Sequence, residues 1–157
     1  MNDQLKRQLP GLIAAATEWA IAQEASARSV GRSLDLGEAD EAVSVGVAFP
    51  EKVRLCIVST IPKPDHPLLV EAMKMTDFLG EGTLGLTLGN AIFVLAGHER
   101  QRWLLRHELR HVAQYEHAGS IGSFLQEYLE QVLSVGYRDA PLEADARRFE
   151  KRIGMTG

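Results

Sequence analysis

The chain has 157 residues, of which 45% are hydrophobic and 24% are charged, and its formal net charge is −4. These values are typical of one globular domain with its own core, and the small acidic excess predicts neither nucleic acid nor a membrane as a partner. A single cysteine, Cys56, excludes a disulfide within the chain and favours a reducing compartment. We expect one domain over 1–157, with N-terminal helices in 1–50, strands and a hairpin in 51–97, and further helices in 98–157.

No stretch of the chain predicts a membrane-spanning helix. The longest uncharged run, 82–97, is shorter than the roughly 20 residues that such a helix needs, and it contains several turn-forming residues. Near the N-terminus two basic residues precede a short apolar run, but Pro10 and Gly11 interrupt it and Glu18 follows it. A cleaved signal peptide is therefore not expected, and we predict a cytoplasmic protein.

The first two thirds of the chain alternate helical and extended patterns. Hydrophobic periodicity and β-branched content predict helices over 10–29, 38–48 and 68–75, and strands over 52–60, 83–88 and 91–95. Pro50 ends the second helix, and three prolines break regular structure within 61–67. Gly89-Asn90, between the last two strands, favours a two-residue hairpin turn, because such a turn needs positive φ.

The remainder of the chain is predicted to be helical, over 101–116, 121–135 and 141–152. The first of these segments contains neither glycine nor proline, and Gly119 is placed to end its helix. Ser120 and Asp139 are the expected N-caps of the other two helices. Arginines at every fourth position of the first helix indicate a solvent-exposed face, and they are Arg102, Arg106 and Arg110.

The sequence His107-Glu108-Leu109-Arg110-His111 lies within the first of these helices. Residues four apart on a helix are neighbours, so His107 and His111 can direct two nitrogens to one ion at the roughly 2.0–2.1 Å of a zinc–nitrogen bond. Glu108 lies where it can accept a proton from a water on that ion. The motif therefore predicts one zinc ion per chain, with Glu108 as the catalytic base.

A catalytic zinc usually has three protein ligands, so a third must come from elsewhere in the chain. One candidate is His117, because H-E-x-x-H-x5-H resembles the ligand spacing of metzincin peptidases. Those proteins have a glycine where this chain has Gln114, and the glycine ends their helix. On a continuous helix, His117 would lie about 100° around and about 15 Å along from His107.

The other candidate is Glu143, in a span that resembles the second motif of gluzincins, A-P-L-E-A-D-A over 140–146. Three segments, H-E-L-R-H-V-A-Q-Y-E, F-L-x-x-Y-L and Y-R-D-A-P-L-E, resemble small bacterial zincin-like proteins of undetermined substrate, over about half of the chain. The resemblance implies that Glu143 is the third ligand. The chain departs from thermolysin-like enzymes at Arg147, where they have an acid, and the alternative role of Glu143 is an ion pair with this arginine.

The resemblance implies an α+β, zincin-like fold, in which a small sheet with an edge hairpin packs on the helix of the motif, with further helices at the C-terminus. It also implies a zinc metallopeptidase whose substrate, an extended peptide or protein segment, pairs with the edge strand. Glu108 would take a proton from the zinc-bound water and pass it to the leaving amine. Candidates to stabilise the transition state or support the site are Tyr137, Tyr115, His117 and Asp145.

Two other functions stay open. The first is a zincin-like protein that keeps zinc for stability or partner binding without catalysis. The second is a metal hydrolase with three histidine ligands that acts on RNA, because H-x3-H-x5-H also occurs in a bacterial endoribonuclease family. That family has glycine where this chain has Glu108, and the acidic net charge does not favour an RNA substrate.

Overall fold

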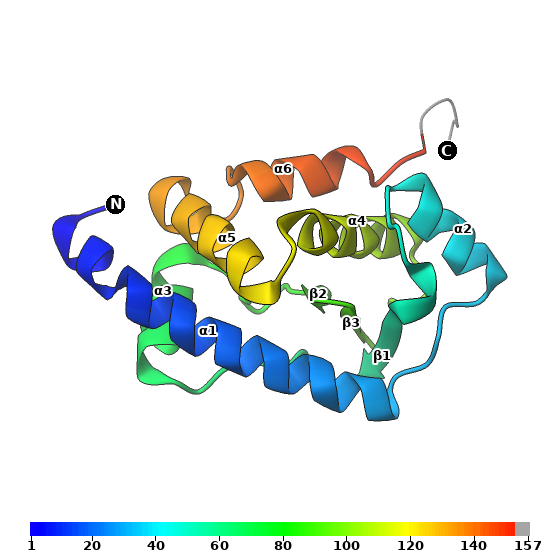
Figure 1. Ribbon diagram of the computed structural model, residues 1–157, viewed down its shortest axis with the longest axis horizontal. Helices are drawn as coiled ribbons and strands as arrows, with labels where there is room; N and C mark the ends of the chain where they lie inside the picture. Colours follow the sequence, from blue (N-terminus) through cyan, green and yellow to red (C-terminus); the bar gives the residue numbers. More distant parts are fainter. Residues whose placement is uncertain (153–157) are drawn as a thin grey trace.

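The computed structural model describes residues 1–152. This part of the chain has an α+β fold with six α-helices and a three-stranded mixed sheet (Figure 1). The helices are α1 (Asp3–Val30), α2 (Leu36–Ser44), α3 (Pro67–Thr76), α4 (Arg102–Ala118), α5 (Ile121–Val135) and α6 (Pro141–Arg148). The strands are β1 (Arg54–Val58), β2 (Gly85–Leu88) and β3 (Ala91–Leu95), and a short 3-10 helix spans Pro50–Lys52.

The sheet has the strand order β1-β3-β2. β2 and β3 form the predicted antiparallel hairpin, in which Leu88 pairs with Ala91. Gly89, the first residue of the turn, has a φ of 65°, in agreement with the positive φ predicted for this turn. β1 runs parallel to β3, so β2 lies at one edge of the sheet, and the sequence pattern did not predict this order.

Helices cover both faces of the sheet, with α1 on one face and α4 on the other (Figure 1). The alternation of side chains along β3 supplies both layers, because Phe93 belongs to the core on the α1 side and Ile92 to the core on the α4 side. On the α4 side, Leu105, Leu109 and Val112 pack against the strands. This packing fixes the rotation of α4 and therefore determines which of its side chains face the rest of the molecule.

Helix boundaries differ from the prediction mainly where caps or prolines were misinterpreted. α1 begins seven residues before the predicted start, because the side chain of Asn2 caps it and Pro10 is accommodated inside the helix. α2 begins at Leu36, because Asp35 and Glu38 form a capping box, and it ends at Ser44, before the predicted end near Pro50. α6 ends at Arg148, and its N-cap is Ala140 rather than Asp139. The caps of α4 and α5, Gly119 and Ser120, are as predicted.

The interpretation of the arginine row on α4 as a solvent-exposed face is wrong for Arg106 and Arg110, whereas Arg102 is exposed as predicted. Arg106 is only 3% exposed and contacts Glu41 and Ser44 of α2. The guanidinium of Arg110 donates to Asp145 of α6 at 2.8 Å and to the carbonyl of Val45 at 2.8 Å. Arg106 and Arg110 are covered because α2 and the C-terminal segment dock on this face and supply the acids that neutralise them.

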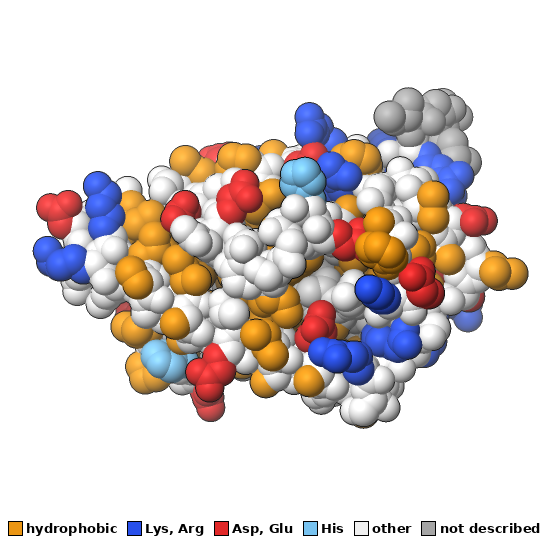
Figure 2. Space-filling view, in the orientation of Figure 1, with side chains coloured by type: hydrophobic (Ala, Val, Ile, Leu, Met, Phe, Trp, Pro, Cys, Tyr) orange, Lys and Arg blue, Asp and Glu red, His pale blue; other side chains and the backbone are white. Residues whose placement is uncertain are grey.

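The surface carries a mixture of acidic, basic and apolar side chains over the face shown in Figure 2. Within residues 1–152, no helix combines the length and the apolar character needed to cross a membrane.

Candidate metal centre

Helix α4 places His107 and His111 one turn apart, with their Nε2 atoms 3.2 Å from each other. Both rings are largely buried, and their planes are inclined at 77°. The helix is continuous here because it contains neither glycine nor proline, and its apolar stripe holds it on the sheet. The two imidazoles therefore point to one place, as the spacing of the motif predicted.

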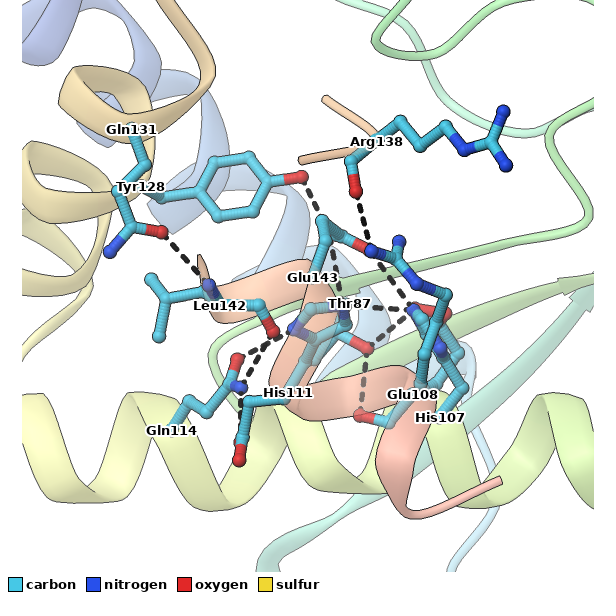
Figure 3. A network of polar contacts seen from close by, with 12 residues as sticks. Thr87, His107, Glu108, His111, Gln114, Tyr128, Gln131, Arg138, Leu142 and Glu143 are labelled. Carbon is cyan, nitrogen blue, oxygen red and sulfur yellow. Dashed lines mark hydrogen bonds and ion pairs between the residues drawn. The ribbon is translucent and has the colours of Figure 1, made fainter. Parts of the chain in front are cut away.

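Glu143 reaches the same place from α6 (Figure 3). Its Oε1 atom lies 3.1 Å from His107 Nε2, and its Oε2 atom lies 3.1 Å from His111 Nε2. Ligands about 2.0–2.1 Å from a tetrahedral zinc ion are separated by about 3.3 Å, so these distances are close to those of zinc ligands. We call His107, His111 and Glu143 the metal centre, and each is less than 10% exposed.

Hydrogen bonds to the other ring nitrogens fix both histidines in the form that binds metals. His111 Nδ1 lies 2.7 Å from Oε1 of Gln114, whose amide nitrogen donates to Leu142 O and to Asp145 Oδ2. That nitrogen has only acceptors as neighbours, so the amide oxygen must face the ring. His107 Nδ1 lies 2.9 Å from a carboxylate oxygen of Glu150. Each Nδ1 therefore carries a hydrogen, so each Nε2 faces the centre and offers its lone pair to a metal ion when it is deprotonated.

Three electron-pair donors converge on the metal centre, and this arrangement requires a positive partner, either a metal ion or a proton on the imidazoles. Two Nε2 lone pairs and a carboxylate at 3.1–3.2 Å would repel one another without one. A divalent metal ion satisfies all three donors, and imidazole with carboxylate is a donor set that suits zinc. The residues present therefore fit a metal ion.

The pKa values of the three residues show the same demand for positive charge. Burial by itself lowers the pKa of His111, but the carboxylates of Glu143 and Glu108 outweigh it and raise the pKa to about 9. The pKa of His107 also shifts upward, because contact with Glu143 outweighs burial. Burial raises the pKa of Glu143, but the two imidazoles outweigh it and hold that pKa well below its usual range. The pocket thus has a negative potential that protons or a metal ion can neutralise.

Glu108 lies next to the metal centre and is held by the neighbouring edge strand. The hydroxyl of Thr87, on β2, lies 2.9 Å from Glu108 Oε1 and 3.1 Å from the Glu108 carbonyl oxygen. Gly85, on the same strand, leaves room for this side chain, because a Cβ atom there would lie 3.0 Å from Glu108 Cγ. Burial raises the pKa of Glu108, so this carboxylate is a stronger base than an exposed one.

The tyrosines near the site have different surroundings. Tyr128, which the sequence analysis did not select, donates from α5 to Glu143 Oε2 at 2.8 Å and so helps to hold that ligand (Figure 3). Tyr115 is buried, stacks on Phe124 and donates to the carbonyl of Thr87 at 3.3 Å. Tyr137 is partly exposed and lines the space beside Glu143, and burial together with Glu143 raises its pKa. Of the two predicted tyrosines, Tyr137 is therefore the one placed to reach a ligand at the centre.

Of the two remaining predicted site residues, Asp145 supports the metal centre and His117 lies away from it. His117 is exposed near the end of α4, which stays helical through Gln114, so it does not join the metal centre. Asp145 is partly buried and accepts from Gln114 and Arg110, and these contacts, against the effect of burial, lower its pKa to about 2. Gln114, Glu150, Tyr128 and Thr87 were missed, because only the docking of other elements brings them to the motif.

The metal centre lies between two hollows of different character. The outer cleft, of about 520 Å³, is lined by His107, Glu108, Glu143 and Trp103 together with the segment 80–85. The inner cavity, of about 80 Å³, lies between α1, α3, α5 and β2 and has mostly apolar walls. Glu108 and Glu143 border both hollows, so a molecule at the metal centre can contact either.

Comparison of the chain with known protein families, with curated protein sequences and with solved structures finds no match. The geometry of the metal centre is therefore the basis for assigning a function.

Proposed function

We propose that this protein is a zinc-dependent hydrolase of the zincin type, with peptide bonds as its substrate. The observation that carries the proposal is the convergence of His107 Nε2, His111 Nε2 and the Glu143 carboxylate beside the buried carboxylate of Glu108. Three protein ligands with a neighbouring base are the arrangement of catalytic rather than structural zinc sites. When bound, zinc supplies a polarised water and an electrophile for the substrate carbonyl.

Glu108 has the position and the basicity for proton transfer. It accepts a proton from the attacking water and returns it to the leaving nitrogen, and the Thr87 hydroxyl holds the carboxylate in place between these steps. The hydroxyl of Tyr137 is the candidate donor to the oxygen that gains charge, because its ring lines both hollows beside Glu143.

The edge strand β2 supports a peptide substrate. Leu95 N donates to Leu84 O, so in the alternating antiparallel pattern the backbone groups of Gly85 and Thr87 point away from β3. The Thr87 carbonyl accepts from Tyr115 and Thr87 is only 5% exposed, so the backbone groups of Gly85 are the part of this edge that an extended peptide can reach. This edge lies beside Glu108, so a peptide paired with it would pass the metal centre.

A metal site without catalysis is the second candidate. The centre joins α4 to α6, and Tyr128 extends it to α5, so a bound ion would also hold three helices together. The three-histidine alternative has less support, because His117 lies away from the centre.

The test is hydrolysis by the zinc-loaded protein of a mixed-sequence peptide library, followed by mass spectrometry. We expect cleavage by the wild type and a loss of at least about a hundredfold in Glu108→Gln, which retains zinc because Glu108 is not a ligand. Glu130→Gln, an exposed change on α5, is the matched control and should cleave normally. Equal cleavage by Glu108→Gln would contradict the peptidase proposal, and zinc binding without any cleavage would favour the non-catalytic one.

A further inference from the structure

The inner cavity is an unusual feature for a well-packed core. Protein interiors leave few voids larger than a water molecule, and an apolar void lowers stability. One water needs about 10–15 Å³ of such space, so a cavity of about 80 Å³ has room for several water-sized spheres. This is about the space that a branched aliphatic or aromatic side chain occupies.

The walls of the cavity differ sharply in chemistry from one end to the other. Most of the wall is apolar and comes from three helices, with Ala16 and Trp19 on α1, Leu69 and Met73 on α3, and Phe124 and Leu125 on α5. The charged groups gather at one end, where Glu108, His111 and Glu143 border the cavity. A mostly apolar cavity with a few polar groups at one end is the usual form of a ligand site.

The segment 77–83, between α3 and β2, separates the cavity from the outer cleft. Leu79 is buried against the cavity, whereas Asp77, Gly80 and Glu81 face the cleft. Asp77 and Leu79 both have a φ of 59° and are the only non-glycine residues among 1–152 with positive φ. For leucine this conformation is strained, so the segment stores energy that a different conformation of Leu79 would release.

The segment is tied mainly to itself. The backbone N–H groups of Phe78, Gly80 and Thr83 donate to acceptors no more than three residues away. Phe78 packs edge-on against Tyr128, with ring centroids 5.5 Å apart. Displacement of the segment therefore breaks few hydrogen bonds to the rest of the molecule, and its main cost is the apolar contacts of Phe78 and Leu79.

We propose that the inner cavity binds an apolar group of the substrate, an aliphatic or aromatic side chain next to the carbonyl at the metal centre, and that Leu79 moves aside to admit it. The inference rests on the proposed function and names its substrate class, which is peptides with a large apolar residue beside the cleaved bond. A substrate with a small or charged residue there leaves the cavity empty or buries a charge, and it binds more weakly.

The test compares two zinc-binding probes, acetohydroxamate and isocaprohydroxamate, which differ only by an isobutyl group. Their affinities for the zinc-loaded protein are measured by calorimetry. We expect isocaprohydroxamate to bind at least about tenfold more tightly, because each buried methylene contributes a factor of about four. Equal affinities would overturn the proposal while leaving the metal centre intact. Failure of both probes to bind would instead contradict an accessible metal centre, and hence the proposed function.

Two matched pairs of variants locate the apolar group. Ala16→Leu fills the cavity from α1, and Ala14→Leu makes the same change on the exposed side of that helix. Met73→Phe narrows the cavity from α3, and Met75→Phe is its exposed counterpart. We expect either cavity variant to lose most of the preference for isocaprohydroxamate and to retain acetohydroxamate binding, whereas the two exposed variants keep both. An unchanged preference in a folded cavity variant would place the isobutyl group elsewhere and overturn the proposal.

Discussion

The geometry of the metal centre depends on residues that hold the ligands in place. Gln114 contacts His111 and, through its amide nitrogen, Asp145 and Leu142, so it links α4 to α6. Glu150, which follows α6, contacts His107 Nδ1 and so orients that ring. One histidine is therefore oriented by a neutral amide and the other by a carboxylate, and both retain a free Nε2.

Replacement of Gln114 by leucine should weaken zinc binding about 10- to 100-fold, because His111 Nδ1 loses the acceptor that orients the ring. The measurement is a competition titration with a zinc chelator. Gln126→Leu, an exposed change on α5, is the control and should bind zinc as the wild type does. Wild-type affinity in Gln114→Leu would show that the ring needs no such support.

The pKa shifts at the metal centre predict that the stability of the metal-free protein depends on pH. Glu143, with its lowered pKa, contributes stability that is present above its ordinary value of 4.5 and is lost as the pH falls. His111, with its raised pKa, contributes stability that is present below its ordinary value of 6.5 and is lost as the pH rises through about 9. Urea unfolding with a chelator should therefore show greater stability at about pH 5.5 than at about pH 8.5.

Bound zinc should remove most of the loss of stability between about pH 5.5 and about pH 8.5. The ion takes the place of the protons and binds the deprotonated ligands more tightly at higher pH. His117→Ala should leave both profiles unchanged, since His117 is exposed and away from the centre. A metal-free protein as stable at about pH 8.5 as at about pH 5.5 would contradict the charge arrangement derived for the site.

The residues on the motif helix were predictable, whereas their partners were not. The spacing of His107 and His111 fixes their relation on any helix, so the sequence alone predicts their convergence. Glu143 was found only through a resemblance to other proteins. Gln114 drew attention only as a departure from a glycine, because its role depends on the docking of α6, which no local pattern encodes.

At the scale of elements, the site depends on the contact between β2 and α4. Gly85 on the edge strand faces Glu108, and the absence of a side chain there lets the carboxylate lie against the strand. Thr87, two residues along the same strand, faces the same helix and binds the carboxylate. The strand thus supports Glu108, and in the proposed peptidase it is also the edge with which a substrate pairs.

Gly85→Ala should reduce the peptidase rate about tenfold or more with an unchanged zinc content. The added Cβ would lie 3.0 Å from Glu108 Cγ and 3.1 Å from Cδ, so the base must shift, and small shifts of reacting groups are costly. Gly82→Ala is the control, because its Cβ would have no atom within 4 Å. Equal loss of rate in both variants would point to a general effect on the segment rather than to the position of Glu108.

Most elements could be predicted from local patterns, and the errors have identifiable causes. The hairpin and α5 follow from turn and cap residues, such as Gly89 and Ser120, whose effect is local. The early start of α1 was missed because Pro10 favours the first turn of a helix and here lies well inside one. The arginine row was misinterpreted because its neutralising acid, Glu41, lies more than sixty positions away on α2.

At the scale of the whole molecule, the layers bring the elements of the site together. α1 and α4 cover opposite faces of the sheet, and α5 and α6 dock beside α4 (Figure 1). The parallel pairing of β1 with β3, which places β2 at the edge next to α4, depends on contacts between distant segments. The α+β class was predictable from composition and periodicity, but this order of strands was not.

The central claim is that His107, His111 and Glu143 hold a metal ion, and zinc content measured by mass spectrometry after dialysis tests it most directly. The wild type, His111→Ala, Glu143→Ala and His117→Ala are compared after exposure to equal zinc. We expect about one zinc per chain in the wild type and in His117→Ala, and a large loss in the other two. A wild type without zinc, or a Glu143→Ala variant that retains it while His117→Ala does not, would contradict the account.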